Sequence, residues 1–146
     1  MIKDRVCEWF ATCSYVGYLP LAPGTWGSLL ACIIAYLFPR SSSPSILVVL
    51  IIAAIVTAER ARGSDDDPGR IVIDEYVGML VAVIGHGSAA ADLIKAFILF
   101  RAFDILKPYP IRKLERLPGA YGIVADDILA GTYANAALIL WGVVWR

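Results

Sequence analysis

Residues 97–135 read FILFRAFDILKPYPIRKLERLPGAYGIVADDILAGTYAN and place a dense group of charged side chains between two apolar segments. Asp104 lies inside the first apolar segment, and Asp126 and Asp127 lie near the start of the second. Because proline cannot continue a helix, Pro108 marks the end of the first one, and the stretch predicts a helix, a charged surface turn and a second helix. Placing carboxylates beside apolar segments costs free energy unless they are paired or bind a cation. We therefore expect a functional site in this stretch.

The rest of the chain is unusually apolar. Hydrophobic residues make up 59% of its 146 residues and the mean hydropathy is +0.69, whereas soluble domains hold about 45–50% apolar residues even with glycine included. The length suits one domain, which we expect to cover residues 1–146. The net charge of zero gives a nucleic-acid partner no electrostatic support. The composition therefore predicts a small membrane protein that binds no nucleic acid.

Five apolar segments predict five helices, at 19–38, 46–58, 71–85, 93–106 and 123–145. Nothing in them alternates like a membrane β-barrel. Only the first and fifth reach the roughly 20 residues of a straight span, so the others are extended by flanking residues, thin the bilayer, or are buried. Apolar residues at helical spacing in 2–13 predict an amphipathic helix, at a membrane surface or packed on the core. The expected fold class is all-α, a small polytopic membrane bundle of about five apolar helices plus this N-terminal helix.

Basic residues are distributed unevenly between the loops, and cytoplasmic loops collect Lys and Arg. With the N-terminus inside and five crossings, the inner loops hold Lys3, Arg5, Arg60, Arg62, Arg70, Lys107, Arg112, Lys113 and Arg116. The outer loops and the C-terminus hold only Arg40 and Arg146, when Lys95 and Arg101 within the fourth segment are left aside. The asymmetry predicts a multi-pass protein with a cytoplasmic N-terminus.

This topology brings acidic residues from three segments to the inner face. They lie at the start of the third segment, the end of the fourth and the start of the fifth, and are Asp74, Glu75, Asp104, Asp126 and Asp127. Hard oxygen ligands of this kind suit Mg²⁺, which commonly bridges to a substrate phosphate. We therefore expect these acids to bind Mg²⁺ and to be the catalytic groups. The alternative is internal ion pairing, in which Arg101 or Lys107 neutralises Asp104.

Groups that suit a phosphate lie at the same face. Lys107 offers a point charge and Arg112 a planar fork on the turn after the fourth segment. Residues 23–28 break the first segment, and a loop opening into a helix there presents N–H groups to an anion, with Thr25 as a candidate cap. The simpler alternative is that the basic residues anchor the protein at lipid headgroups. Because the single histidine, His86, falls on the outer side, the pattern favours metal-assisted attack of water on a phosphate ester.

Two predicted helices carry small residues in line with their acids. One stripe consists of Asp127, Gly131 and Asn135, and the other of Glu75, Gly78 and Ala82. Such stripes let helices approach closely, so we expect the glycines to serve packing. The acidic run at 65–67 is expected to form a solvated turn.

Three blocks resemble the characteristic blocks of the phosphatidylglycerophosphatase A family in order and spacing. They are LAPGTWGSL at 21–29, IVIDEYVGM at 71–79 and FRAFDILKPYPIRKLERLPGAYGIVADDILAG at 100–131. The resemblance implies a magnesium-dependent phosphatase of the bacterial inner membrane that removes the terminal phosphate of phosphatidylglycerophosphate and gives phosphatidylglycerol. The residues in matching motif positions are Asp74, Glu75, Asp104, Lys107, Asp126 and Asp127. The implied partners are a phospholipid substrate and the membrane. The topology inferred above puts the expected active site on the cytoplasmic side.

Two other functions stay open at this point. A small membrane transporter or channel subunit would use its acids as a relay, and would spread them across the depth of the membrane. A soluble helical bundle would act on a water-soluble phosphate. The lipid-phosphatase hypothesis assigns the binding of substrate phosphate to Lys107, Arg112 and Thr25. It leaves the general base open among Asp104, Asp126 and Asp127.

Overall fold

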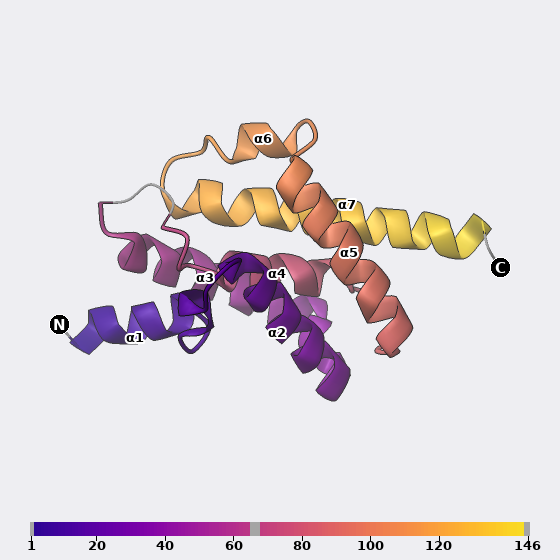
Figure 1. The fold of residues 1–146 in the computed structure, drawn as a ribbon, viewed down its shortest axis with the longest axis horizontal. Helices are drawn as coiled ribbons and strands as arrows, with labels where there is room; N and C mark the ends of the chain where they lie inside the picture. The colour runs from indigo at the N-terminus through magenta and orange to yellow at the C-terminus, as the bar shows by residue number, and fades with distance from the viewer. Residues whose placement is uncertain (1, 65–67, 145–146) are drawn as a thin grey trace.

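The computed structural model describes residues 2–64 and 68–144, and within these residues it consists of helices and contains no strand (Figure 1). In chain order the elements are α1 (Ile2–Ala11), the short 3-10 helix η1 (Val16–Tyr18), α2 (Pro23–Leu37), a second 3-10 helix η2 (Pro39–Ser42), α3 (Pro44–Arg62), α4 (Ile73–Ala82), α5 (Ala90–Leu106), α6 (Ile111–Leu114) and α7 (Ala120–Val144). The prediction of an all-α fold is confirmed. The acidic run at 65–67, expected to form a solvated turn, lies outside the described residues.

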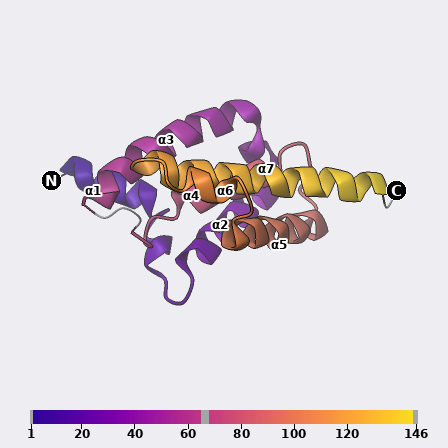
Figure 2. The ribbon, with the colours of Figure 1, turned by 90° about the horizontal axis from the view of Figure 1, so that it is seen from above.

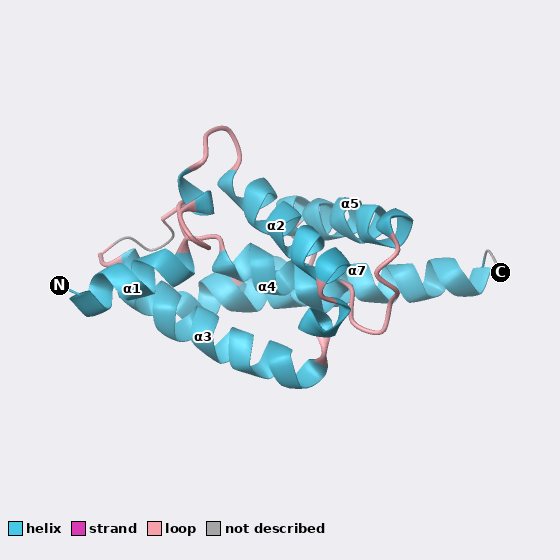
Figure 3. Ribbon diagram, turned by 90° about the horizontal axis from the view of Figure 1, so that it is seen from below, coloured by secondary structure: helices cyan, strands magenta, loops and turns pink. Residues whose placement is uncertain are grey.

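Helix α4 is the centre of the fold. Eight of its ten residues are buried, among them the fully enclosed Val77, Met79 and Leu80. Seen from above, α3 and α5 lie on opposite sides of α7 (Figure 2). Figure 3 shows α4 between α3 on one side and α2 on the other. A helix of 10 residues is only about 15 Å long. Because most of its residues are buried, α4 fills the interior of the bundle.

Glycines set the close approach of α4 and α7. A Cβ atom added to Gly78 would lie 2.7 Å from the carbonyl oxygen of Asp127 and 2.8 Å from Phe100 Cε2. One added to Gly131 would collide with the carbonyl oxygen of Gly78. Neither position has room for a side chain, which confirms the prediction that these glycines serve packing.

Asn135 fixes the far end of the same helix pair. Its Nδ2 donates to the carbonyl oxygens of Val81, Ala82 and Ile84 at 3.3, 3.0 and 2.8 Å. The last carbonyls of a helix lack a partner within the helix, and the amide of α7 donates to them here, although Val81 O also accepts from the amide of Ile84 at 3.2 Å. The stripe on α7 therefore combines close packing with a cap for its neighbour.

The helices differ in length from the expected segments, and two of these differences decide which helices could span a membrane. The first apolar segment forms α2 of only 15 residues, because Pro23 at the first helical position fixes its start. The second forms α3 of 19 residues, because the helix formers at 58–62 continue the helix beyond the apolar run. In the described part of the chain, α3 and the 25-residue α7 are the helices long and apolar enough to cross a membrane. The expectation that the first segment reaches this length, and the second does not, is wrong.

Large apolar side chains are exposed along several helices. They include Ile33 on α2, Val49 and Ile52 on α3, Ile98 on α5 and Leu140 on α7, each at least 48% exposed. Monomeric soluble proteins seldom expose extensive apolar surface. Contact with lipid would remove the cost of exposing these side chains to water.

The N-terminal helix predicted from sequence is confirmed as α1. It packs against α3 and buries Cys7 and Ala11, while Trp9 and Phe10 stay exposed. Its face toward α3 accounts for part of its apolar spacing. Contact of the exposed aromatic residues with a membrane surface stays a prediction.

The crossing of α4 and α7 gives a test of the fold. Replacing Gly131 by alanine should lower the free energy of unfolding by about 1–3 kcal/mol, because the methyl group overpacks against the α4 backbone. The matched control is Gly142→Ala on the same helix, where an added Cβ meets nothing within 4 Å. The control should be neutral or stabilised by up to about 1 kcal/mol, since alanine is the better helix former. Thermal unfolding in detergent measures both, and equal midpoints would contradict the close crossing.

Candidate functional site

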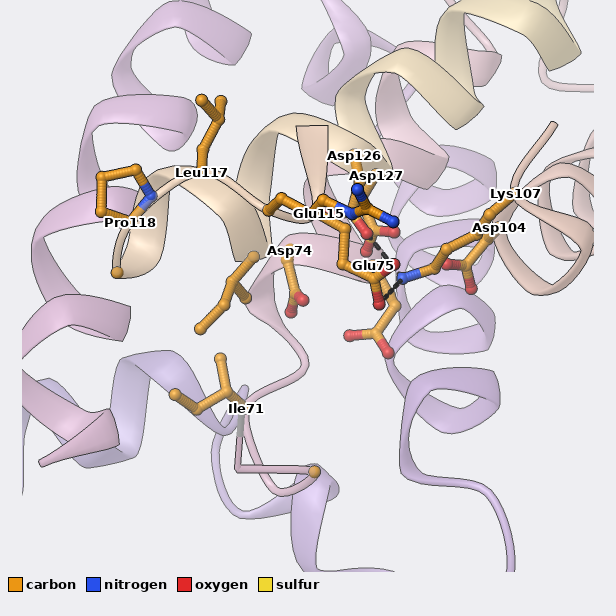
Figure 4. Close-up of a pocket in the computed structure, with 14 residues that line it drawn as sticks. Ile71, Asp74, Glu75, Asp104, Lys107, Glu115, Leu117, Pro118, Asp126 and Asp127 are labelled. Carbon is orange, nitrogen blue, oxygen red and sulfur yellow. Dashed lines mark hydrogen bonds and ion pairs between the residues drawn. The ribbon is translucent and has the colours of Figure 1, made fainter. Parts of the chain in front are cut away.

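A cavity of about 530 Å³ lies where the start of α4, the end of α5 and the first turns of α7 meet (Figure 4). The segment 115–119, between α6 and α7, forms part of its wall. The acidic side chains that line it are Asp74, Glu75, Asp104, Glu115, Asp126 and Asp127. The basic side chains that line it are Lys107 and Arg116. This acidic cavity is therefore dominated by carboxylates.

Three of the acids form a compact group, here called the acidic triad: Asp74, Glu75 and Asp127. Their ligand oxygens all lie within 4.8 Å of one another, and Asp74 and Asp127 are only 8% and 3% exposed. Asp74 and Glu75 occupy the first turn of α4, where the helix dipole favours negative charge. Asp127 comes beside them because Gly78 lets the backbone of α7 approach α4 at that residue.

Several carboxylate oxygens of the cavity are buried and have no hydrogen-bond partner among the described residues. They are Asp74 Oδ1, Glu75 Oε2, Asp126 Oδ1 and Asp127 Oδ2. Buried polar atoms without a partner are rare and costly in folded proteins. A bound cation would satisfy them, and carboxylate oxygens are ligands that Mg²⁺ prefers. The acidic triad therefore fits a divalent metal ion.

Basic side chains hold the other acids. Arg101 Nη1 donates to Asp104 Oδ2 at 2.6 Å, within α5. Lys107 Nζ donates to Asp126 Oδ2 at 2.7 Å and to Glu115 Oε1 at 2.9 Å. The alternative of internal ion pairing is thus correct for Asp104, whose partner is Arg101. Lys107 pairs with Asp126 in place of Asp104.

The backbone of Lys107 turns its side chain into the cavity. Lys107 ends α5 in the left-handed conformation with φ of 44°, which residues other than glycine rarely adopt. Its ammonium lies toward Asp126 and Glu115 (Figure 4). Burial lowers the pKa of Lys107, but its hydrogen bonds to Asp126 and Glu115 raise it, and the net pKa lies above the ordinary value. Lys107 therefore stays charged and neutralises part of the cavity.

The start of α2 packs against the same group of side chains. A Cβ atom added to Gly24 would collide with Glu75 Oε1 and lie 3.1 Å from Arg101 Nη1. Ala22 is the N-cap residue of α2, and no side chain caps the helix there. The prediction of Thr25 as a cap is therefore wrong, since it is the third residue of the helix. Thr25 does not line the cavity either, and its contact with phosphate stays a prediction from sequence.

Most of the predicted site residues meet at this cavity, although they come from three separate helices. Those that line it are Asp74, Glu75, Asp104, Lys107, Asp126 and Asp127. Arg112, predicted to act beside Lys107, does not line this cavity, but it lines a neighbouring depression of about 450 Å³ that Lys107 also lines. The two residues lie on either side of the turn formed by 108–110.

Two charged residues of the cavity are not predicted from sequence. Glu115 received no role, yet it accepts a hydrogen bond from Lys107 at 2.9 Å. Arg116 is expected from sequence only as a basic residue of a cytoplasmic loop, yet it lines the cavity. The available signal was the pair of prolines at 108 and 110, because a chain that reverses there brings 115 and 116 back toward Lys107.

Comparison with known proteins identifies the family. Residues 9–141 match the family model described as phosphatidylglycerophosphatase A. A protein of Bacteroides thetaiotaomicron, provisionally named a phosphatidylinositol-3-phosphatase, is 39% identical over 130 residues, which cover 81% of this chain and 82% of that protein. Proteins named phosphatidylglycerophosphatase A from Haemophilus influenzae and Escherichia coli are 36% and 35% identical, over 81% and 88% of this chain and 77% and 79% of their own lengths.

No solved structure matches the chain at a significant level. The family model nevertheless covers most of the chain, and the three relatives each share more than 30% identity across most of it. This chain therefore belongs to the phosphatidylglycerophosphatase A family of lipid phosphatases.

Proposed function

We propose that this protein is a Mg²⁺-dependent phosphatase that removes the terminal phosphate of phosphatidylglycerophosphate and gives phosphatidylglycerol. The observation that carries the proposal is the buried acidic triad beside Lys107, in a cavity of about 530 Å³, a volume typical of ligand sites. The family description and the relatives from Haemophilus influenzae and Escherichia coli favour this substrate. The relative from Bacteroides thetaiotaomicron is named for a different one, phosphatidylinositol 3-phosphate. Both lipids carry a phosphomonoester on a head group that a phosphodiester joins to diacylglycerol.

The acidic triad would hold the metal ion. Bound there, Mg²⁺ would supply a Lewis acid that neutralises phosphate charge and makes water a better nucleophile. The support for this assignment is the set of buried carboxylate oxygens without a protein partner. Asp104 and Asp126, predicted from sequence as further ligands, line the same cavity.

Among the candidate general bases we favour Asp126. Its Oδ2 accepts from Lys107 at 2.7 Å, while its Oδ1 is buried without a partner and is available to accept a proton. Water would add to phosphorus, and the bond between phosphorus and the head-group oxygen would break. The proton that Asp126 takes from the water would then pass to that leaving oxygen. Lys107 would contact a phosphate oxygen as a point charge.

We further propose that the chain folds as one domain over 1–146, as a polytopic bundle in the bacterial inner membrane. Helices α3 and α7 are long enough to span it, and the exposed apolar side chains of α2 and α5 support contact with lipid. Helices α2, α4 and α5 are shorter, so they would cross with the help of flanking residues or local thinning of the bilayer. Helix α4 would lie inside the bundle, away from lipid.

The active site would face the cytoplasm. The end of α3 and the start of α7 lie together, since the amide of Ala120 donates to Glu59 Oε2 at 2.8 Å. The cavity lies near the same end, because 115–119 line it. Arg60, Arg62 and Arg116, which the charge asymmetry predicts to be cytoplasmic, belong to these segments. A proton or cation relay would need acids at several depths, whereas these acids surround one cavity.

Replacing Asp127 by asparagine should reduce Mg²⁺-dependent phosphate release from phosphatidylglycerophosphate by about 100-fold or more, because it removes a ligand oxygen from the triad. The matched control is Asp92→Asn on α5, whose carboxylate pairs with Lys95 at 3.1 Å and does not line the cavity. The control should keep wild-type turnover. Near-wild-type turnover of Asp127→Asn would contradict the assignment of the triad as the metal site.

Metal binding should also be measurable without turnover. Mg²⁺ at 100 times its dissociation constant should raise the free energy of unfolding by about 2.7 kcal/mol, since it binds the folded state alone. Asp127→Asn should lose most of this increase. In EDTA the variant should unfold at no lower temperature than the wild type, because the substitution removes a buried charge without a protein partner. Equal Mg²⁺-induced shifts in both proteins would place the metal elsewhere.

Sidedness can be read from cysteine labelling. In a chain with its three cysteines replaced by alanine, Ser64→Cys after α3 should react with an impermeant maleimide only from the cytoplasmic side. Ser45→Cys at the start of α3 should react only from the opposite side, because α3 would cross between them. Both serines are exposed in the structure. Labelling of intact cells and inverted vesicles measures this, and the reversed pattern would refute a cytoplasmic site.

A further inference from the structure

Two depressions of opposite charge share a wall in this molecule. The acidic cavity is the first. The second, here called the basic groove, has a volume of about 450 Å³ and is lined by four basic side chains, Lys107, Arg112, Lys113 and Arg116. No acid lines the groove among the described residues. Lys107 and Arg116 line both depressions and so form the boundary between them.

We propose that the basic groove binds the phosphodiester of the lipid substrate while the phosphomonoester occupies the acidic cavity. This inference rests on the proposed function and adds to it the class of substrate. The class is glycerophospholipids that carry one phosphodiester and one phosphomonoester. Charge complementarity supports it, because a phosphodiester keeps one negative charge and needs no metal ion to meet a basic surface. The shared boundary places the two phosphate sites next to each other.

Arg112 is the main phosphodiester ligand of the groove. Lys107 directs its ammonium to Asp126 and Glu115, and Lys113 Nζ lies 5.0 Å from the ring centre of Tyr109. Among the described residues, no hydrogen bond or ion pair engages the exposed guanidinium of Arg112. Its planar fork can give two parallel N–H bonds to a phosphate, which a lysine cannot. Arg112 therefore favours substrates that carry a phosphodiester in addition to the phosphomonoester.

The rim of the groove suits the membrane surface. Leu106 and Tyr109 line the groove and are 69% and 73% exposed. Apolar and aromatic side chains beside Lys and Arg are typical of the boundary between acyl chains and headgroups. A phospholipid lying there would present its phosphodiester to Arg112 at the level where its acyl chains end. The monoester, farther along the head group, would reach the acidic cavity.

The test compares two lipids in the same mixed micelles. Phosphatidylglycerophosphate offers both phosphates, and phosphatidic acid offers a phosphomonoester alone. Arg112→Gln should lower kcat/KM for phosphatidylglycerophosphate by about tenfold, the loss expected for a hydrogen bond to a charged group. Its preference for this lipid over phosphatidic acid should fall by about fivefold or more. Arg112→Lys, which keeps the charge without the fork, should recover part of the preference.

Two controls separate the groove from its alternatives. Arg40→Gln, at an exposed arginine of η2, should leave both rates unchanged because Arg40 lines neither depression. The water-soluble head group glycerophosphoglycerophosphate should lose rate in Arg112→Gln as the lipid does, because it retains the phosphodiester.

The possible outcomes distinguish a phosphodiester site from a headgroup anchor, and both from a failure of the proposed function. An equal loss on phosphatidic acid and phosphatidylglycerophosphate, or a loss on lipids but none on the soluble head group, would make Arg112 a headgroup anchor and overturn the phosphodiester site. A wild type that hydrolyses phosphatidylglycerophosphate and ignores phosphatidic acid supports the site, because the latter offers the groove no ligand. A wild type that hydrolyses no substrate in the presence of Mg²⁺ overturns the proposed function itself.

Discussion

The structure depends on the burial of three carboxylates in the interior of a helical bundle. The ligand oxygens of Asp74, Glu75 and Asp127 lie within 4.8 Å of one another, a separation at which like charges repel strongly in a medium of low dielectric constant. Three of the oxygens involved have no hydrogen-bond partner among the described residues. Burial of unpaired charge is costly, and a bound cation, as under the proposed function, would offset that cost. The same three carboxylates would therefore cost the fold free energy without a cation and bind the metal ion under the proposed function.

Much of the helix packing serves to bring these acids together. Helix α4 carries two of them at its start, and α7 carries the third where it crosses α4. Gly78 and Gly131 have no side chain, which lets the two backbones approach closely. Asn135 of α7 donates a hydrogen bond to the carbonyl oxygen of Ala82 at the other end of α4. Gly24 lets α2 pack against Glu75. The contacts of Gly78, Gly131 and Asn135 are with backbone and neutral or apolar groups in the packed interior, so the crossing of α4 and α7 does not depend on surface charges.

The meeting of the acids was predictable from sequence, whereas their partners were not. The alternation of helix direction, inferred from the basic loops, is enough to bring Asp74, Asp104 and Asp127 to one end of the bundle. Lys107 pairs with Asp126 from a left-handed backbone conformation. The spacing of hydrophobic residues in the sequence does not predict such a conformation. Arg112 lies in a separate groove because the one-turn helix α6 follows a reversal of the chain. Helix lengths were misjudged because apolar runs do not mark helix ends, which Pro23 and the helix formers at 58–62 set.

The charge balance of the two depressions bears on the order of binding under the proposed function. Six acidic side chains line the acidic cavity against two basic ones, and Lys107 is already shared by Asp126 and Glu115. A phosphomonoester carries about 1.5 to 2 negative charges near neutral pH, so the cavity without a cation would repel it. The basic groove has no acidic lining among the described residues, and under the proposal it would hold a lipid by its phosphodiester before the metal binds. Capture of the lipid would then depend on Arg112 and hydrolysis of its terminal phosphate on the acidic triad, with Lys107 and Arg116 at the boundary of both. The metal ion would control only the second step.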